Sequence, residues 1–230
     1  MKLIYNIIIL FISFFTFVFL NGCKSDDPII SPADNFEFSY TSTRDTIMSD
    51  FANVLVLDTV KVLLKDIKLN VSSSNDSTNF KVGPYVLYLR LNTTVNSIGS
   101  ALIPSGTYDK VKFEVHKLEP NETPPDSDFV DANGRYSVVC KGRFNGNIFI
   151  YKSQPSAKQI LQFPNNLVIT PSKTNVTLLV RPQIWFIKNN DYMDPNNSAN
   201  WNDIDNNIKN NVRQNFKIFK DNDKNGIPDN

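Results

Sequence analysis

Short stretches of the chain alternate apolar and polar residues, the period typical of strands with one buried face. Phe36 to Tyr40 is the first such stretch, and Tyr85 to Leu91 is another. The most regular one, Val111 to Val115, has Val and Phe on one face and Lys and Glu on the other. We therefore expect strands at these places, with His116 among the solvent-facing charges.

The stretch from Val60 to Val71 changes its buried face. Its apolar residues have even numbers up to Leu64 and odd numbers from Ile67 onward. Because a strand changes face only where an extra residue is inserted, we expect a β-bulge at Lys65–Asp66. The short apolar run before this stretch is expected as a separate strand.

Turn signals separate these stretches. Pro104-Ser105-Gly106 has turn chemistry, and Asn145-Gly146 between two apolar stretches predicts a tight hairpin. The last strand begins at Val176, and Pro182 indicates an edge position or a break. About nine short strands without a helical pattern among them predict an all-β fold, an antiparallel β-sandwich over residues 36–186, and exclude a parallel α/β architecture.

After the sandwich the composition shifts to Asn and Asp, and the apolar period becomes helical. One apolar stripe consists of Ile204, Ile208, Val212, Phe216 and Phe219. This stripe predicts a C-terminal amphipathic helix within residues 187–230, and such a stripe must pack on the sandwich or on a partner.

Within residues 1–22, Leu3 to Leu20 is a nearly continuous apolar run with Lys2 as the only positive charge before it. A basic start and an apolar centre are the pattern of a secretory signal, although about 20 apolar residues are also enough for an uncleaved membrane anchor. The end of the run favours the signal, because three residues there match the cleavage motif of bacterial lipoprotein signal peptides. They are Leu20, Gly22 and Cys23, with Asn21 as a departure from the motif.

This resemblance implies that Cys23 begins the mature chain and carries acyl chains such as palmitate, so that residues 23–35 are a lipidated tether. The implied partner is a lipid bilayer, and the implied location is the outer membrane of the cell. Lys24-Ser25-Asp26-Asp27 resembles the surface-export tag of some Gram-negative lipoproteins, which implies a domain at the cell surface. A plain solvated tether is the alternative.

The charge balance is nearly neutral, with 24 Lys plus Arg against 23 Asp plus Glu and a formal net charge of +1. This balance excludes the electrostatic footprint of a nucleic-acid-binding protein. With Cys23 acylated, Cys140 has no partner for a disulfide. We therefore expect Cys140 to be a buried thiol in a fold stabilised by its hydrophobic core.

The sharpest chemical motif is D-x-D-x-N-G-x-x-D near the C-terminus. Its candidate calcium ligands are Asp221, Asp223, Asn225, Asp229 and the backbone carbonyl of Ile227. Oxygen atoms at alternate positions, followed by Gly226 at the turn, suit Ca²⁺. The motif resembles the calcium loops of thrombospondin type 3 repeats and, less closely, the EF-hand, whose bidentate Glu it lacks. The alternatives are a weak structural calcium site that closes the end of the helix and a polar chain end without metal; no cofactor is required.

Other chemistry is sparse, because zinc sites need clustered Cys and His and the chain has a single His. Residues 119–134 contain three Pro and five acidic residues, and we expect a long exposed loop there. Such carboxylates could pair across a substrate, as they do in glycosidases. Trp185, Phe186 and Tyr192 form either an aromatic binding platform or the seal of a sandwich edge.

The segment from Pro104 to Tyr108, with the strand that follows, resembles part of a group of bacterial lipoproteins of unknown function, over residues 54–118. That resemblance implies a β-sandwich and no activity. The sequence thus predicts a non-catalytic envelope lipoprotein whose sandwich binds a protein or glycan or serves in assembly. The alternative hypothesis is a carboxylate-dependent hydrolase that acts on glycans through residues 119–134.

Overall fold

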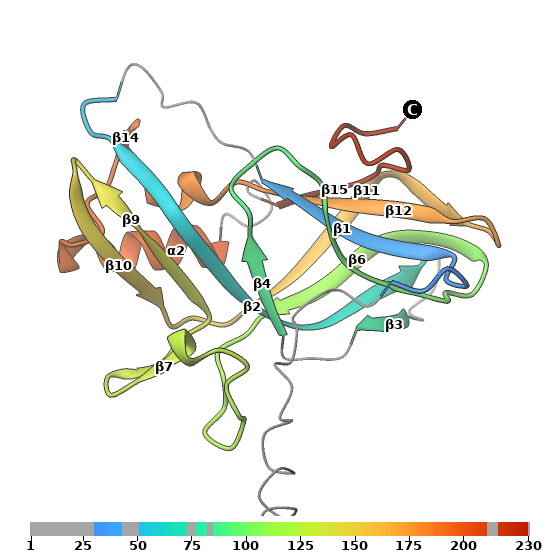
Figure 1. Ribbon diagram of the computed structural model, residues 1–230, viewed down its shortest axis with the longest axis horizontal. Coiled ribbons are helices and arrows are strands. Elements are labelled where there is room, and N and C mark those ends of the chain that lie inside the picture. The colour runs from blue at the N-terminus through green and yellow to red at the C-terminus, as the bar shows by residue number, and fades with distance from the viewer. Residues whose placement is uncertain (1–29, 43–50, 73–76, 82–84, 211–215, 230) are drawn as a thin grey trace, which may run out of the picture.

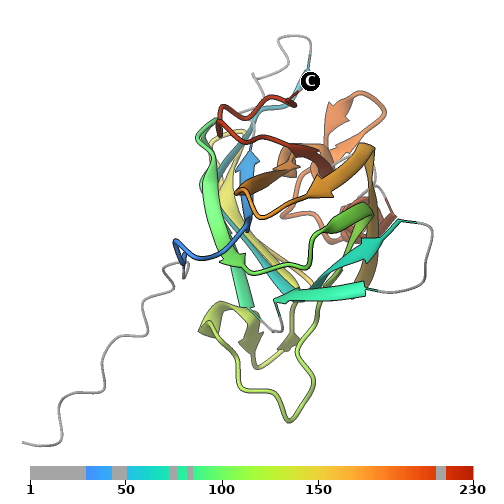
Figure 2. The same ribbon diagram turned by 90° about the vertical axis from the view of Figure 1, so that its right-hand side faces the viewer.

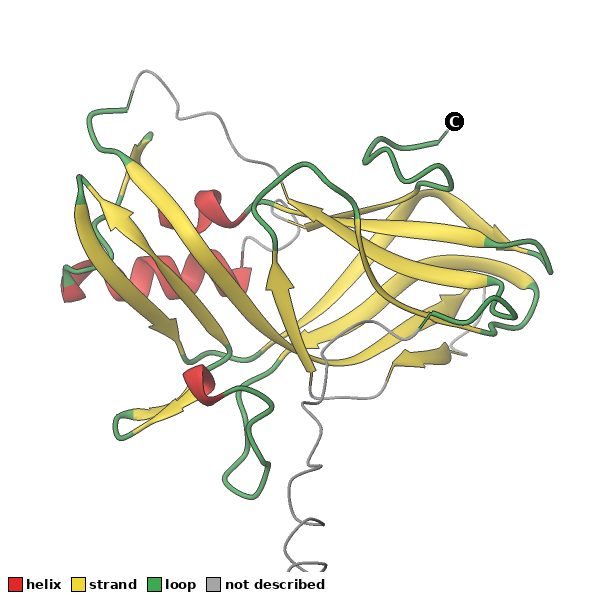
Figure 3. Ribbon diagram, viewed as in Figure 1, coloured by secondary structure: helices red, strands yellow, loops and turns green. Residues whose placement is uncertain are grey.

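Strands make up most of the fold in the computed structural model, together with one α-helix and three 3₁₀-helices among the described residues (Figure 3). The residues it describes are 30–42, 51–72, 77–81, 85–210 and 216–229. The fold is all-β and sandwich-like, as the alternating pattern predicts. No helix within these ranges is long and apolar enough to cross a bilayer. The predicted signal segment and Cys23 lie outside the described residues.

The smaller sheet has the strand order β15-β12-β1-β5 (Figure 1). Its strands are β1 (Phe36–Ser42), β5 (Asn96–Ala101), β12 (Thr174–Val180) and β15 (Phe216–Lys220). β1 is antiparallel to β5 but parallel to β12. The predicted antiparallel sandwich therefore contains one parallel pair. Strands this far apart in the sequence can be parallel because no hairpin fixes their relative direction.

The larger sheet has the order β10-β9-β2-β6-β11, and β3 and β4 also pair with β2. Its strands are β2 (Leu55–Val71), β3 (Ser77–Lys81), β4 (Tyr85–Leu89), β6 (Gly106–Val115), β9 (Val138–Phe144), β10 (Asn147–Ser153) and β11 (Ala157–Ile169). The long β2 pairs with β9 through its first half and with β6 through its second half. It therefore joins the two ends of the sheet.

The predicted bulge in β2 is confirmed. Asp66 has a positive φ of 53°, and β2 shifts register against β6 between Lys65 and Lys68. Leu64 before the bulge and Ile67 after it both face the main core. The apolar run before Val60 is not a separate strand, because β2 continues through it with a second register shift beside Asp58.

The predicted hairpin is also confirmed. Asn145 and Gly146 connect β9 to β10 with φ values of 48° and 84°. Left-handed backbone at both positions is what a type I′ turn requires, and Asn-Gly is the sequence that adopts it most readily.

Two hydrophobic clusters lie on opposite faces of the larger sheet. The main core fills the space between this sheet, the smaller sheet and the C-terminal helix. The second cluster lies on the outer face and consists of Leu63, Leu118, Phe129, Tyr136 and Val139. Three of these residues belong to the segment 117–136, so this segment covers the outer face of the sheet.

The expected exposed loop at residues 119–134 is confirmed in part, because most of these residues are exposed but the segment also contains short elements and a buried anchor. The elements are the 3₁₀-helix η1 (Ser127–Phe129) and the short strands β7 (Val130–Asp131) and β8 (Gly134–Arg135). Phe129 is fully buried. Burial of its ring against the outward-facing Leu63 orders a segment whose Pro and acidic residues alone suggested exposure.

The C-terminal part contains a shorter helix than predicted. Its elements before β15 are η2 (Pro182–Phe186), β13 (Ile187–Lys188), β14 (Asp191–Tyr192), η3 (Ser198–Asn200) and α2 (Trp201–Asn210). The predicted stripe is confirmed at Ile204 and Ile208, which are buried. It was wrong at Phe216 and Phe219, which lie on strand β15, while Val212 lies outside the described residues. Apolar residues here complete the edge of β12, and this pairing overrides the helical spacing.

Candidate metal centre

The aspartate-rich loop 221–229 follows β15 and turns back over the outer side of the smaller sheet (Figures 1 and 2). The expected position at the end of a helix was wrong, because β15 precedes the loop. Two residues of the loop have left-handed backbone, Lys224 with φ of 54° and Gly226 with φ of 80°. Glycine suits the second position because it adopts this conformation without steric cost.

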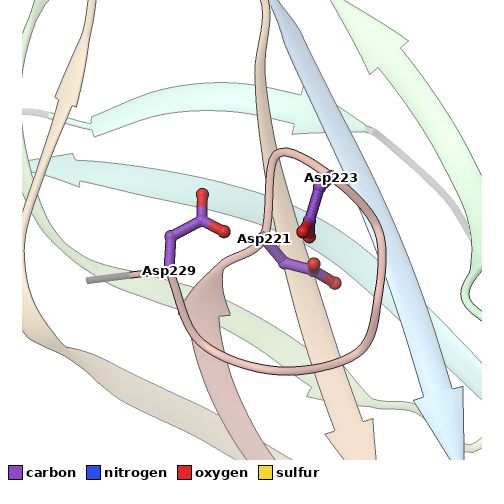
Figure 4. A group of neighbouring side chains, drawn as sticks. All are labelled: Asp221, Asp223 and Asp229. Carbon is purple, nitrogen blue, oxygen red and sulfur yellow. The ribbon is translucent and has the colours of Figure 1, made fainter.

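The loop brings three carboxylates together. One oxygen from each of Asp221, Asp223 and Asp229 lies within 4.8 Å of the others. Figure 4 shows the carboxylates of Asp221 and Asp223 next to each other, with Asp229 where the loop returns. Three of the predicted ligands therefore converge.

Hydrogen bonds within the loop hold these side chains. Asp221 accepts from the backbone N–H groups of Asn225 (3.0 Å) and Gly226 (3.2 Å). The Asn225 side-chain amide donates to Asp223 (2.8 Å), and its oxygen accepts from the N–H of Ile227 (2.7 Å). An amide oxygen has a second lone pair, so Asn225 retains the capacity to bind a cation.

The loop is attached to the smaller sheet through β12. Thr177 donates its hydroxyl hydrogen to Asp221 (2.7 Å), and the Asn175 side-chain amide donates to the Asp221 carbonyl (2.8 Å). The N–H of Asn175 donates to the Asn222 side chain (3.0 Å). Asn175 and Thr177 were not predicted as site residues from the sequence. Their polar side chains alternate with the buried Val176 and Leu178, which was the available signal.

Glu37 on β1 forms a second attachment of the loop, through Lys224. It is fully buried and accepts hydrogen bonds or ion pairs from Ser97, Lys173 and Lys224. Burial raises the pKa of the Glu37 carboxyl, but these three partners outweigh burial and hold that pKa below its ordinary value. Lys224 therefore forms its ion pair with Glu37. The described cation nearest to the three aspartates is then Lys220, whose Nζ lies 3.9 Å from the Asp229 carboxylate.

The donor set fits a hard cation. Ca²⁺ binds six to eight oxygen ligands, mostly carboxylates, amide and backbone carbonyls and water. The loop supplies three carboxylates and the Asn225 amide oxygen. Because the exposed side chain of Ile227 is apolar, the backbone carbonyl is the only ligand that Ile227 can offer. The chemistry that such an ion would supply is structural, joining the chain end to the smaller sheet.

The acidic segment 119–134 has a different arrangement, because four of its five carboxylates pair with lysines of the larger sheet. Lys61 contacts Asp126 (2.5 Å) and Asp128 (2.9 Å). The remaining ion pairs are Lys141–Asp128 (2.7 Å), Lys152–Asp131 (2.7 Å) and Lys65–Glu122 (3.3 Å).

These contacts lower the pKa values of the carboxyl groups. Hydrogen bonds from Lys141 and Lys61 lower the pKa of Asp128. Lys152, with help from the Tyr136 hydroxyl, lowers that of Asp131 to about 2. A carboxylic acid that donates a proton to a leaving group needs a raised pKa, so neither of these residues suits that role.

His116 does not face solvent, and that expectation was wrong. Its side chain is buried, and its Nε2 lies 2.7 Å from Glu122. His116 lies on the outer face near Glu114, as the alternation indicates, but it is buried because the acidic segment with Glu122 covers this face. Burial raises the pKa of Glu122, but hydrogen bonds from the Glu119 N–H, His116 and Lys65 outweigh it and lower that pKa to about 2.

The remaining candidates are core residues. Cys140 is fully buried, as predicted, and burial raises the pKa of its thiol, which makes it unreactive. Trp185, Phe186 and Tyr192 are also buried and pack against the sandwich. They therefore seal the fold and do not form an exposed aromatic platform.

Comparisons with protein-family models, with curated proteins and with solved structures returned no match for this chain. Its function is therefore argued from its own sequence and geometry.

Proposed function

We propose that the chain is a non-catalytic lipoprotein of the cell envelope, anchored in the outer membrane through acylated Cys23. Its β-sandwich serves at the cell surface as a binding or assembly module for a protein or glycan. The observation that carries this proposal is the apolar segment 1–22 ending in the motif at Leu20 to Cys23. Two or more acyl chains anchor a protein stably, since each buried methylene contributes about 0.8 kcal/mol.

We further propose that loop 221–229 binds Ca²⁺ as a structural ion. The convergence of three carboxylates, together with the use of Lys224 by Glu37, supports this role. A cation there reduces the repulsion among the aspartates and stabilises the attachment of the loop to β12.

The lowered pKa values and ion pairs of segment 119–134 weigh against the alternative of a glycan hydrolase. If that alternative holds, Asp126→Asn, Asp128→Asn and Asp131→Asn combined abolish a hydrolytic activity of the wild-type chain. We expect no activity on envelope glycans before or after the change.

Mass spectrometry of the chain extracted from membranes tests the anchor. We expect a mature protein that begins at Cys23 and carries fatty acids. A chain that retains residues 1–22, or a bare thiol at Cys23, contradicts the proposal. Cys23→Ala is the matched variant and is expected to leave an unacylated precursor.

Thermal unfolding with millimolar calcium or with chelator tests the loop. An ion at ten times its dissociation constant stabilises the folded state by about 1.4 kcal/mol, which shifts the melting temperature by a few degrees. We expect Asp223→Asn to remove this shift and Asp203→Asn, on the exposed side of α2, to retain it. Equal melting temperatures with and without calcium contradict a calcium site.

A further inference from the structure

Strand β10 is an unprotected edge of the larger sheet. Among the described strands it pairs only with β9, in continuous register from Asn147 to Ser153. The β9–β10 hairpin lies at the end of this sheet that points away from the smaller sheet (Figure 1).

On the free side of β10, no backbone hydrogen bond to another strand occurs among the described residues. In an antiparallel pair, alternate residues direct both backbone groups to the partner strand, and the residues between them direct theirs outward. The two-residue turn makes Phe144 and Asn147 a hydrogen-bonded pair, so Ile148, Ile150 and Lys152 present N–H and C=O groups at the edge. The side-chain amide of Asn196 reaches the Ile148 carbonyl only at 3.4 Å.

The other long edge in the described part of the chain is protected. β11 shifts register between Gln162 and Leu167, a segment that contains Pro164. The outer strands of the smaller sheet, β5 and β15, are short. β10 has seven residues, with no proline and no bulge, two of the features by which sheet edges normally avoid pairing.

The side chains along β10 are apolar where a solvated edge is normally charged. Ile148 is 76% exposed and Ile150 is 61% exposed, both on the outer face of the sheet. Lys152, next on that face, is held by Asp131 of its own chain at 2.7 Å. The edge therefore offers backbone hydrogen bonds beside an apolar row whose one charge is already paired.

We propose that two copies of the chain pair edge to edge through β10, antiparallel, with Ile150 of each copy opposite Ile150 of the other. Ile150 is the middle residue of the strand, so a two-fold axis through it places Ile148 opposite Lys152 of the second copy. The three residues whose backbone groups point to the free edge, Ile148, Ile150 and Lys152, then lie opposite the same three residues of the second copy. This arrangement gives about six backbone hydrogen bonds. In this register the exposed Ile150 of one copy lies beside Ile150 of the other on the outer face, and this apolar match favours a second copy as the partner.

The result is a continuous sheet across the two copies, with four isoleucines together on its outer face. One strand edge buries much less than the about 1,600 Å² of a standard interface, so the dimer is expected to dissociate on dilution. The pairing rests on the proposed assembly role, and the partner in that role is a second copy of the chain.

Cross-linking of the full chain in detergent tests the proposal. Ile150→Cys, treated with a short bismaleimide, is expected to give a covalent dimer, while the buried Cys140 does not react. The matched control is Ile160→Cys on β11, an exposed isoleucine (48%) on the same face of the same sheet but at the opposite edge. We expect about tenfold more dimer from position 150, because the two thiols meet only at the proposed axis. The unsubstituted chain measures any reaction of Cys23.

Sedimentation at increasing concentration provides the second measurement. Ile150→Lys is expected to leave the chain monomeric with unchanged circular dichroism, and Ile160→Lys is expected to leave the dimer intact. A monomeric wild-type chain at about 0.1 mM, well above a micromolar dissociation constant, overturns the proposal. Equal cross-linking at positions 150 and 160, or a cross-link from position 150 to a different protein only, does so as well. In detergent the pairing of two copies does not require a membrane anchor. An unacylated Cys23 would therefore contradict the proposed function without affecting this result.

Discussion

Two acidic segments cover opposite sides of this molecule, and they balance their charge in different ways. Segment 119–134 lies below the larger sheet and loop 221–229 lies above the smaller sheet (Figures 1 and 2). In the first, lysines from β2, β9 and β10 contact the carboxylates at 2.5–3.3 Å. In the second, three carboxylates lie within 4.8 Å of one another, and the nearest described amine is 3.9 Å from one of them.

The difference teaches where a cation is needed. Carboxylates that already have lysine partners gain little from a metal ion, because their charge is neutralised by the protein. Carboxylates that face each other repel, and an external cation relieves that repulsion. The position of the nearest lysines, rather than the number of acidic residues, is therefore what distinguishes the proposed calcium loop from segment 119–134.

The largest expected effect comes from removing the hydrophobic anchor of segment 119–134. Phe129→Ala is expected to lower the free energy of unfolding by about 3–5 kcal/mol, because the ring is fully buried in the outer-face cluster. Urea unfolding measures it. Phe129→Leu, which keeps most of the apolar volume, is expected to lose much less. A loss below about 1 kcal/mol for the alanine variant would mean that ion pairs alone hold the segment in place.

The second effect distinguishes the buried from the exposed aspartate of loop 221–229. In chelator, Asp221→Asn is expected to cost about 2 kcal/mol, because Asp221 is fully buried and accepts hydrogen bonds from Thr177 and two backbone N–H groups. Asp223→Asn, at an exposed position, is expected to stay within about 0.5 kcal/mol of the wild type. Equal losses in urea unfolding would contradict the attachment through β12.

The third effect is a pH dependence that arises from Glu122 of segment 119–134. The pKa of Glu122 is about 2 in the folded chain against an ordinary value of 4.5. Its contribution is therefore fully present above pH 4.5 and is lost as the pH falls toward 2. Allowing for solvent screening, we expect about 1–2 kcal/mol.

Urea unfolding between pH 2 and pH 6 measures this contribution. Glu122→Gln is expected to flatten the stability profile in that range. Glu119→Gln is the matched control, because no ion pair of the Glu119 side chain occurs among the described residues, and its profile is expected to follow that of the wild type. Parallel profiles for both variants would show that Glu122 does not hold the segment.

The smallest effect comes from a single surface ion pair. Lys141→Met is expected to cost about 0.5 kcal/mol, because Asp128 keeps Lys61 as a partner. The loss is expected to vanish at about 1 M salt, where screening is nearly complete. A loss that persists in salt would indicate that packing of the lysine stem, rather than its charge, is responsible.

The sequence predicts those parts of the fold that depend on neighbouring residues. The bulge at Lys65–Asp66 follows from a change of parity, and the hairpin follows from the two residues at its turn. Phe216 and Phe219 were placed on a helix because their spacing suits one. Only the open edge of β12, far away in the sequence, makes them part of a strand. His116 shows the same limit, since the alternating pattern does not reveal that the acidic segment covers this face of the sheet.

For the candidate site, the sequence identifies the aspartates but not what surrounds them. Asp221, Asp223 and Asp229 follow from a short motif. Glu37 and Thr177 come from other strands, and no local pattern connects them to the loop. The ion pair between Lys224 and Glu37 is likewise formed only in the folded chain, and it removes Lys224 from the charges that could neutralise the three aspartates.

The parallel pairing of β1 with β12 has a consequence for how the chain acquires its structure. Ser39 and Asn175, which hydrogen-bond across this pair, are 136 positions apart in the sequence. Contacts between distant positions form slowly, because a long loop must close before they contribute any stability. The β9–β10 hairpin can form early from adjacent residues, whereas the smaller sheet must wait until β12 and β15 have been synthesised. Its first strand, β1, can pair with β5 on one side, but its other side stays open until β12 is available.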